Sequence, residues 1–396
     1  MSYYGFPQPA SVHVDNPLTG FGEVITAVLT PLVQVSFIYG INNDLIITGS
    51  NGSAYVTESN LSFVKIGTGA GADQSASLAT KKILKYYPGQ GSLARYTTVY
   101  STPTMGSIMQ MGLVDDYDGI AFGYSGSHFG IMRWYNGTLA EFVSQSAWNI
   151  DTMDGSGNPA NASGIALNPQ TGNVYQVQLQ YLGFGNINFY IENSVTGHLE
   201  PVHRIKYPNT FVTTSLANPT LPISAMVKNT TNNTDVWLMT PSIAGFVEGT
   251  RRFTGPVNSE QGAVTVTTEQ SVFTIRNKTT YNNRRNKVRI YLRAMTLTTD
   301  ANTGTATIRI VSNGTLSPTG SYTDISPNSV IEVAPSGSSV SGGRTLGRWS
   351  LASRAGATED LQSLEFEIPP GDTITIAAGA TNSNLVSATL SWVEDF

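Results

Sequence analysis

Apolar and polar residues alternate along most of the chain with the two-residue period of β-strands. In the stretch KVRIYLR, residues 287–293, the side chains of Val288, Ile290 and Leu292 are expected on one face, with basic and polar side chains on the other. This alternation predicts a half-buried strand. The spacing of an amphipathic helix is not sustained, so we expect an all-β protein.

Further stretches repeat the alternation, separated by Gly, Pro, Ser and Asn turns. They are 174–182, 187–193 and 235–240 in the first half, and 306–311, 364–368, 372–377 and 388–393 in the second. Residues 247–266 lack an apolar rhythm, so we place a domain boundary at 256. Residues 31–256 and 257–396 are predicted to form two antiparallel β-sandwich or jelly-roll domains. Residues 1–30 are predicted to be an extended docking arm, with a locally packed strand as the alternative.

Charged residues make up only 12% of the 396 residues, about half the usual share. An uncharged polar surface is cheaper to desolvate than unpaired charges, which suits a chain covered by neighbours in an assembly, and it also suits a sugar-binding β protein. The net charge of −5 argues against nucleic-acid binding, which requires Lys and Arg to neutralise phosphates.

The chain contains no cysteine, which excludes disulfides, thiolate metal sites and cysteine nucleophiles. Its first residues lack a basic segment followed by an apolar core, so no secretory signal is expected. The most apolar stretch, 24–40, contains Pro31 and Gln34 and is shorter than the roughly 20 residues that span a bilayer. We therefore expect no membrane span, and nothing predicts a cofactor.

The candidates for catalysis are few. None of the four histidines, at positions 13, 128, 198 and 203, has a carboxylate or a second histidine at ligand spacing, so neither a zinc site nor a Ser/His/Asp triad is supported. Carboxylates cluster at 114–119 and 151–158, where a pair on separate loops would suit a polysaccharide-degrading enzyme. No glutamate lies in a recognisable catalytic stretch, so we expect no enzymatic activity and no catalytic residue.

The stretch WNIDTMDGSGNPANASG, residues 148–164, resembles the start of a calcium loop, because oxygen-bearing residues follow one another at alternate positions. Pro159 stands where such a loop needs glycine, and no acidic residue follows at the required distance. We therefore predict no metal site, with Asp151 and Asp154 as the ligands if an ion does bind. The alternative is a tight turn in which Asp154 accepts local backbone hydrogen bonds and two glycines adopt positive φ.

Three aromatic residues, Trp134, Tyr135 and Tyr124, lie close to the Asp clusters in the sequence. An aromatic ring beside Asp and Asn side chains is typical of a carbohydrate site, so these three are our glycan-binding candidates. Packing in the core is the alternative interpretation.

Basic residues are concentrated between positions 251 and 293, which hold nine of the 22 Lys and Arg residues. We predict an assembly surface formed by a stripe of Arg284, Arg285, Lys287, Arg289 and Arg293. A solvated sheet face with local salt bridges is the alternative. Aromatic residues are not interleaved there as stacking on nucleic acid requires.

Six phrases occur in a fixed order along the chain. They are YYPGQGSLARYTTVY (86–100), DGIAFGYSGSHFGIMRWYNG (118–137), WNIDTMDGSGNPANASGIALNPQ (148–170), YLGFGNINFYI (181–191), VHRIKYPN (202–209) and NPTLPI (218–223). The set resembles virion structural proteins of tailed bacteriophages and large DNA viruses, in which a lectin-like jelly roll carries such phrases. The part from 273 to 396 is similar to the last domain of these proteins, and residues 158–162 look like an insertion relative to the family phrase.

The resemblance implies that the first domain is lectin-like and that the chain is a virion component at a capsid vertex, in a fibre or tail, or as a decoration, in contact with the host surface. It implies a homo-oligomer, a trimer or pentamer, whose other partners are virion proteins and whose location is the virion. The shared residues are mostly glycines and aromatics, which specify a shape and carry over no catalytic residue. The alternative function is a carbohydrate-binding module for host glycans.

Overall fold

The computed structural model describes residues 28–59, 62–250, 255–300 and 304–396. The chain forms two compact units, with the division between Arg251 and Arg252. Apart from two short 3₁₀ turns, the regular elements of the described residues are antiparallel β-strands, which confirms the all-β prediction. The predicted arm lies outside the described residues up to position 27, and Leu29 and Thr30 already belong to strand β1 (Leu29–Ser36).

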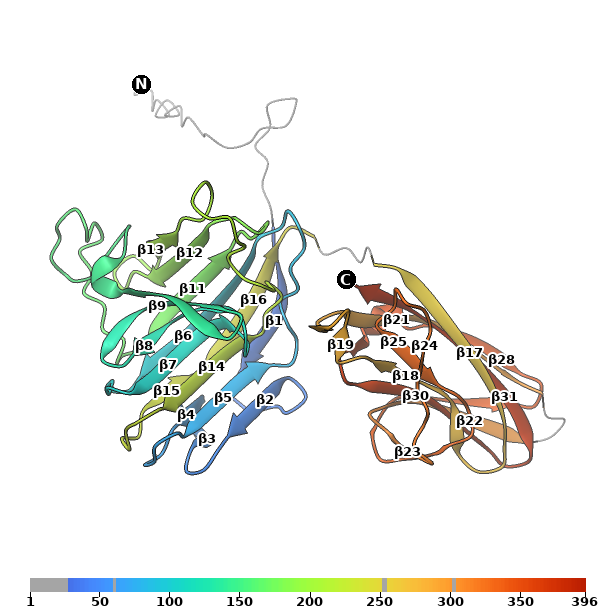
Figure 1. Ribbon diagram of the computed structural model, residues 1–396. Coiled ribbons are helices and arrows are strands. Elements are labelled where there is room, and N and C mark those ends of the chain that lie inside the picture. The colour runs from blue at the N-terminus through green and yellow to red at the C-terminus, as the bar shows by residue number, and fades with distance from the viewer. Residues whose placement is uncertain (1–27, 60–61, 251–254, 301–303) are drawn as a thin grey trace, which may run out of the picture. The chain divides into compact units, whose positions relative to one another are not determined.

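The first unit is a sandwich of two sheets (Figure 1). The seven-stranded sheet has the order β10 (Thr138–Ser144), β9 (His128–Tyr135), β8 (Gly119–Ser125), β7 (Ser107–Val114), β14 (Ile223–Asn229), β5 (Ser75–Thr80) and β2 (Ile46–Ser50). The nine-stranded sheet has the order β13 (Leu199–Ile205), β12 (Ile187–Glu192), β11 (Asn173–Leu179), β6 (Ser92–Tyr100), β15 (Trp237–Thr240), β4 (Phe63–Gly67) and β3 (Tyr55–Ser59), while β16 (Ser242–Glu248) pairs with β6 and β1.

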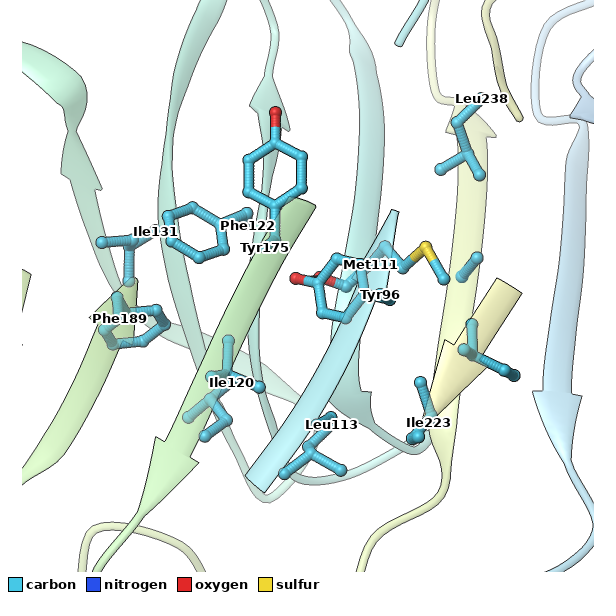
Figure 2. Packing of buried hydrophobic residues seen from close by; sticks show 14 of the residues in the cluster. Tyr96, Met111, Leu113, Ile120, Phe122, Ile131, Tyr175, Phe189, Ile223 and Leu238 are labelled. Carbon is cyan, nitrogen blue, oxygen red and sulfur yellow. The ribbon is translucent and has the colours of Figure 1, made fainter. Parts of the chain in front are cut away.

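The core of this unit lies between the two sheets, where alternate side chains of both meet (Figure 2). Phe122 of β8 packs against Tyr175 of β11 and Phe189 of β12, with ring centroids 5.0 and 5.4 Å apart. Trp148 packs against Phe122 at 5.8 Å, as expected for a core anchor. The buried hydroxyl of Tyr100 donates to the carbonyl of Phe122 at 3.0 Å, so this polar atom is satisfied inside the core.

The second unit is also built from antiparallel sheets. A five-stranded sheet contains β17 (Val257–Val266), β31 (Asn384–Asp395), β21 (Arg289–Thr299), β28 (Gly356–Asp360) and β29 (Glu367–Ile368). An eight-stranded sheet contains β23 (Thr315–Ser317), β26 (Ser339–Ser341), β18 (Gln270–Asn277), β30 (Thr373–Ala380), β22 (Thr305–Ser312), β27 (Arg344–Ala352), β24 (Thr323–Asp324) and β25 (Ile331–Ala334). A hairpin of β19 (Thr280–Tyr281) and β20 (Arg284–Arg285) completes the unit.

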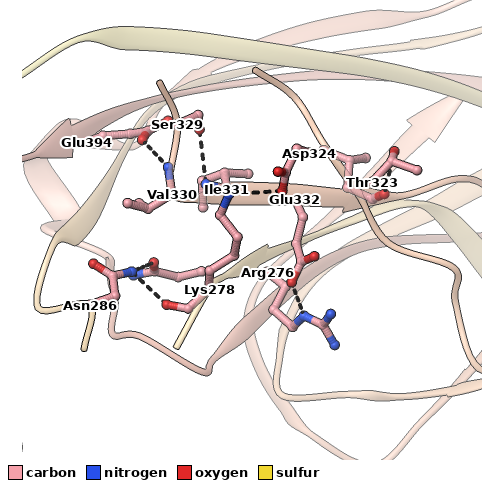
Figure 3. Close-up of polar contacts among 12 residues, drawn as sticks. Arg276, Lys278, Asn286, Thr323, Asp324, Ser329, Val330, Ile331, Glu332 and Glu394 are labelled. Atoms are coloured by element: carbon pink, nitrogen blue, oxygen red, sulfur yellow. Dashed lines mark hydrogen bonds and ion pairs between the residues drawn. The ribbon is translucent and has the colours of Figure 1, made fainter. Parts of the chain in front are cut away.

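A buried carboxylate, Glu394, ties the last strand of this unit to a neighbouring turn (Figure 3). Its oxygens accept hydrogen bonds from the Ser329 hydroxyl at 2.5 Å, the Val330 amide at 2.9 Å and the Asn258 side chain at 2.7 Å. Ion pairs between Arg276 and Glu332 at 2.6 Å and between Lys278 and Asp324 at 2.9 Å lie nearby in the same view.

Three local predictions differ from the structure. Residues 257–266, predicted to lack a strand rhythm, form β17, whose small and polar residues alternate between more and less exposed positions. In 364–368 only the last two residues are in a strand, because a 3₁₀ turn occupies Gln362–Leu364. Strand β21 is buried on both faces over its first four residues, and regular alternation resumes only beyond the register shift between Leu292 and Ala294.

Among the described residues no helix is long and apolar enough to cross a bilayer.

Candidate functional site

On the outer face of the seven-stranded sheet, strand β8 carries only small residues, which form a shallow floor between its neighbours. Ile120, Phe122 and Tyr124 point into the core, so the alternate residues Gly119, Ala121 and Gly123 face outward. These outward positions carry nothing larger than a methyl group. The strand therefore leaves room for side chains of the neighbouring strands to lie across it.

Trp134 of β9 fills this room. Its indole Nε1 donates a hydrogen bond of 2.8 Å to Oε1 of Gln110 on β7, although β8 lies between the two strands. In the register of the sheet, Trp134 is opposite Gly119, and Gln110 is opposite Gly123. Ala121 is midway along the diagonal between them, so the two side chains must meet over its methyl group.

Burial supports this arrangement. Ala121 and Met132 are on the outer face, yet both are 0% exposed, and Gln110 is 3% exposed. Trp134 itself is only partly buried. The indole thus covers the floor of the sheet with one face, and the hydrogen bond to Gln110 holds it there with part of its surface open to solvent. This is a fixed aromatic platform on an outer sheet face.

The other two aromatic candidates lie elsewhere. Tyr124 is buried in the core, with ring centroids 5.0 Å from Phe129 and 5.8 Å from Tyr100, and this burial raises its pKa. Tyr135 follows Trp134 directly and so points to the opposite face of the strand. The structure therefore does not bring Trp134, Tyr135 and Tyr124 together as one exposed cluster.

A turn that sequence reasoning did not single out as a binding element lies beside the Trp134 platform. The Asp115 carboxylate accepts hydrogen bonds from the amides of Tyr117 and Asp118, and the carbonyl of Tyr117 accepts the amide of Gly137 in the β9–β10 turn at 2.7 Å. The side chain of Tyr117 is 49% exposed. These bonds join the turns at the Trp134 end of β7, β8, β9 and β10 and present Tyr117 next to the platform.

A cavity of about 420 Å³ lies at the opposite end of β9. His128 at the start of β9 and Ser144 at the end of β10 line it from outward positions. The chain that follows β10 contributes Gln145, Ser146, Thr152 and Asp154. Ser144 is opposite Gly130, which shares the outer face with Trp134. The cavity therefore borders the sheet face that carries the platform, and its lining also includes Ser127 and the core residue Phe129.

The loop that forms one wall of this cavity is organised by Asp151. Its carboxylate accepts the amides of Met153 and Ser163, each at 2.8 Å, and the Asn161 side chain at 2.7 Å. Burial opposes ionisation, but these donors outweigh it, so the pKa of Asp151 lies below its usual value. Asn161, in the segment that looked like an insertion, is 0% exposed. Both carboxylate oxygens of Asp151 therefore support the loop.

Asp154 has the predicted turn role. Its carboxylate accepts the amide of Ser156 at 2.8 Å, and Gly155 and Gly157 have φ of 76° and 64°. Hydrogen bonds from Ser156 lower the pKa of this exposed carboxyl. Asp151 and Asp154 thus have separate roles, and no group of three or more His, Asp or Glu side chains within the described ranges is arranged to hold a metal ion.

His203 is a structural histidine on β13. Its side chain is almost fully buried beside Phe189, and its Nδ1 accepts the amide of Asn149 at 3.2 Å. Burial lowers its pKa from 6.5 to about 4, so the ring is neutral near pH 7. Its hydrogen bond attaches the start of the 148–164 loop to the sheet.

The five predicted stripe residues do not share one exposed surface. Arg284 and Arg285 are exposed on the β19–β20 hairpin, whereas Arg289 is buried with its Nη1 3.2 Å from the Glu367 carboxylate. Lys287 is partly buried, and Arg293 lines a cavity of about 120 Å³ with Gln362 and Glu365. The reason is that the five residues are divided between a separate exposed hairpin, the connection that follows it, and β21, an inner strand that is buried on both faces at Arg289.

No protein-family model and no curated protein sequence matches the chain. Solved structures with a similar arrangement of strands include a glycosyl hydrolase family protein from Mycobacterium fortuitum (8% identity, 55% of this chain and 99% of that one, TM-score 0.38). Others are peanut lectin (11%, 55% and 97%, 0.33) and a legume lectin-like domain from Entamoeba histolytica (11%, 51% and 89%, 0.29). The chain is thus similar, at the level of the sandwich fold alone, to lectin-like proteins.

Proposed function

We propose that the first unit is a carbohydrate-binding module and that Trp134 is its stacking platform. The observation that carries the proposal is the position of the indole, which lies on a floor of Gly and Ala residues and is tied to Gln110. The apolar face of a sugar ring packs on an aromatic face through its C–H bonds. A platform held before binding loses little conformational entropy when the ligand arrives.

The surroundings of Trp134 suit a ligand that is rich in hydroxyl groups. Tyr117 and Asn136 are exposed on adjoining turns, and the cavity at the other end of β9 is lined by hydroxyl, amide, imidazole and carboxylate groups. Sugar hydroxyls are donors and acceptors at once, so they pair with such mixed side chains. A purely apolar ligand would leave these polar groups desolvated and unpaired.

We propose that this face binds its ligand without hydrolysing it. Hydrolysis of a glycosidic bond requires two carboxyl groups on either side of it. The outward positions of β7, β8 and β9 carry no Asp or Glu. Of the carboxylates in the two predicted clusters, Asp115, Asp118 and Asp151 accept backbone amides that hold turns and loops.

The test is binding to a panel of immobilised polysaccharides and host-cell glycans by the parent protein and by Trp134→Ala. The matched control is Trp237→Ala, which removes a partly buried tryptophan from the other sheet, where Lys65 lies 4.5 Å from its ring. We expect Trp134→Ala to abolish retention and Trp237→Ala to retain it. If no glycan binds the parent protein, or if both variants bind as the parent does, the proposal is wrong.

A place in a virion is a second proposal, which rests on the ordered phrases between residues 86 and 223 and on the low charge of the chain. A carbohydrate-binding unit attached to a second sandwich would serve host contact from a vertex, fibre, tail or decoration position. Mass spectrometry of purified particles, with the copy number of the chain, tests it. Five copies at a vertex or three in a fibre would support it, and absence from particles would refute it.

A further inference from the structure

We propose that the ligand is an extended, uncharged polysaccharide chain that lies along β9 from the Trp134 platform to the Asp154 cavity. This inference rests on the proposed function and adds the ligand class and its length. A module for a single terminal sugar would need only the platform. The position of the cavity at the edge of the same sheet face makes it a second subsite for a more distant sugar of the same chain.

The distance between the two subsites follows from the strand. His128 and Trp134 both point outward and are six residues apart, which is about 20 Å at the rise of a β-strand. This span is longer than one sugar ring. The residues between them on the same face are Gly130 and Met132, and Met132 is fully buried.

Close packing of backbone and of the Phe142 ring forms the surface between the subsites. Gly130 and Gly123 are directly opposite each other on β9 and β8. A β-carbon on Gly130 would collide with the Val143 carbonyl and contact the Phe142 ring, and one on Gly123 would collide with the Met109 carbonyl. Both positions therefore require glycine, and the Phe142 ring lies over Gly130 between the platform and the cavity, where it offers a further apolar surface to the chain.

The charges facing this path indicate an uncharged chain. The cavity contains the Asp154 carboxylate and His128. Among the residues that the structure describes, no Arg or Lys lines the cavity, and Arg133 on β9 points inward to the Ser215 carbonyl at 3.0 Å. Of the described strand residues that face outward from this sheet, Lys228 carries a basic side chain, and it lies on β14 beyond β7. Sialic or uronic acids would meet a carboxylate without a matching guanidinium.

The experiment measures affinity by calorimetry for cello-, laminari-, malto- and chito-oligosaccharides, from monosaccharide to hexasaccharide, with oligogalacturonate as the acidic comparison. For the series that binds, we expect the hexasaccharide to bind at least tenfold more tightly than the disaccharide. His128→Ala together with Asp154→Asn should remove most of this gain and leave disaccharide binding unchanged. His198→Ala, an exposed histidine outside the cavity, is the control.

The outcomes separate this inference from the proposed function. Equal affinity for short and long chains, with no effect of the cavity variant, would overturn the extended chain while Trp134-dependent binding stands. Tighter binding of oligogalacturonate than of every neutral series would overturn the uncharged ligand. Absence of binding in every series would refute this inference, and the proposed function fails only if the wider polysaccharide and glycan panel is also negative.

Discussion

Trp134 and Gln110 are joined by a 2.8 Å hydrogen bond that spans the strand between them and fixes an indole on the outer face of a sheet. The bond satisfies the indole N–H and the buried amide oxygen together. It also selects one orientation of the ring among several rotamers. The platform is therefore formed before any ligand binds.

Replacement of Gln110 by Leu should weaken sugar binding by about fivefold, because one hydrogen bond contributes about 1 kcal/mol to holding the indole in place. The side-chain volume is nearly conserved, so the sheet should remain folded. Calorimetry with the best-binding oligosaccharide measures the effect. Unchanged affinity in Gln110→Leu would show that the bond does not preorganise the ring.

Replacement of Asp151 by Asn should destabilise the first unit by about 2 kcal/mol. In the parent protein the Asp151 carboxylate accepts the N–H of Ser163, whereas the NH₂ group of the new asparagine would face this N–H as a second donor. The folded pKa of Asp151 is lowered, so its contribution is complete above the usual value of 3.8 and is lost as the pH falls through the folded pKa. Urea unfolding at pH 7 and near pH 3 measures this.

The difference between parent and variant should be large at pH 7 and should shrink at the acidic pH. Asp154→Asn is the matched control, because Asp154 is exposed and its carboxylate accepts the amide of Ser156, only two residues away. Its unfolding midpoint at pH 7 should equal that of the parent. A difference for Asp151→Asn that is the same at both pH values would contradict the role of the charged carboxylate.

Protonation of His203 should loosen the attachment of the 148–164 loop. The folded pKa of about 4 is lower than the usual 6.5, so the unfolded chain binds the proton more readily, and stability is lost as the pH falls from 6.5 towards 4. The protonated ring no longer accepts the Asn149 amide. An NMR titration of the His203 ring should give a midpoint near 4, and His203→Gln should flatten the stability profile in this range. A midpoint at or above 6.5 would refute the prediction.

Replacement of Glu394 by Gln should destabilise the second unit by about 3 kcal/mol. The carboxylate is 0% exposed and accepts three close donors, so one amide N–H of glutamine must face a former donor (Figure 3). The indole N–H resonance of buried Trp392 in the ¹⁵N-labelled full chain, followed during urea unfolding, reports on this unit. The control is Glu359→Gln on β28, a partly exposed position. Equal midpoints for both variants would contradict the structural role of Glu394.

Much of the fold is readable from the sequence, because a two-residue period needs only local information. The strands at 174–182, 187–193, 306–311, 372–377 and 388–393 are present within a few residues of their predicted ends. The two-residue period does not show whether only one face of a strand is buried or both. This is why β21, which has basic residues at alternate positions, was expected to be half exposed but is buried on both faces at its start.

The site was less predictable, because it depends on register. Trp134 was identified as a candidate, but its partner Gln110 is 24 residues away and meets it only through the pairing of three strands. Tyr124 belongs to the same hairpin and differs from Trp134 only in facing the core. Asn161 looked like part of an insertion, and its burial against Asp151 has no local signal in the sequence.

The most direct test of the central claim is the indole N–H resonance of Trp134 in the ¹⁵N-labelled protein during titration with the best-binding neutral oligosaccharide. The five tryptophans give one indole signal each, and Trp134→Phe assigns the signal of interest. We predict a saturable shift of the Trp134 signal, with the Trp237 signal unchanged. A saturating ligand that shifts other residues and leaves Trp134 at its original position would contradict the account.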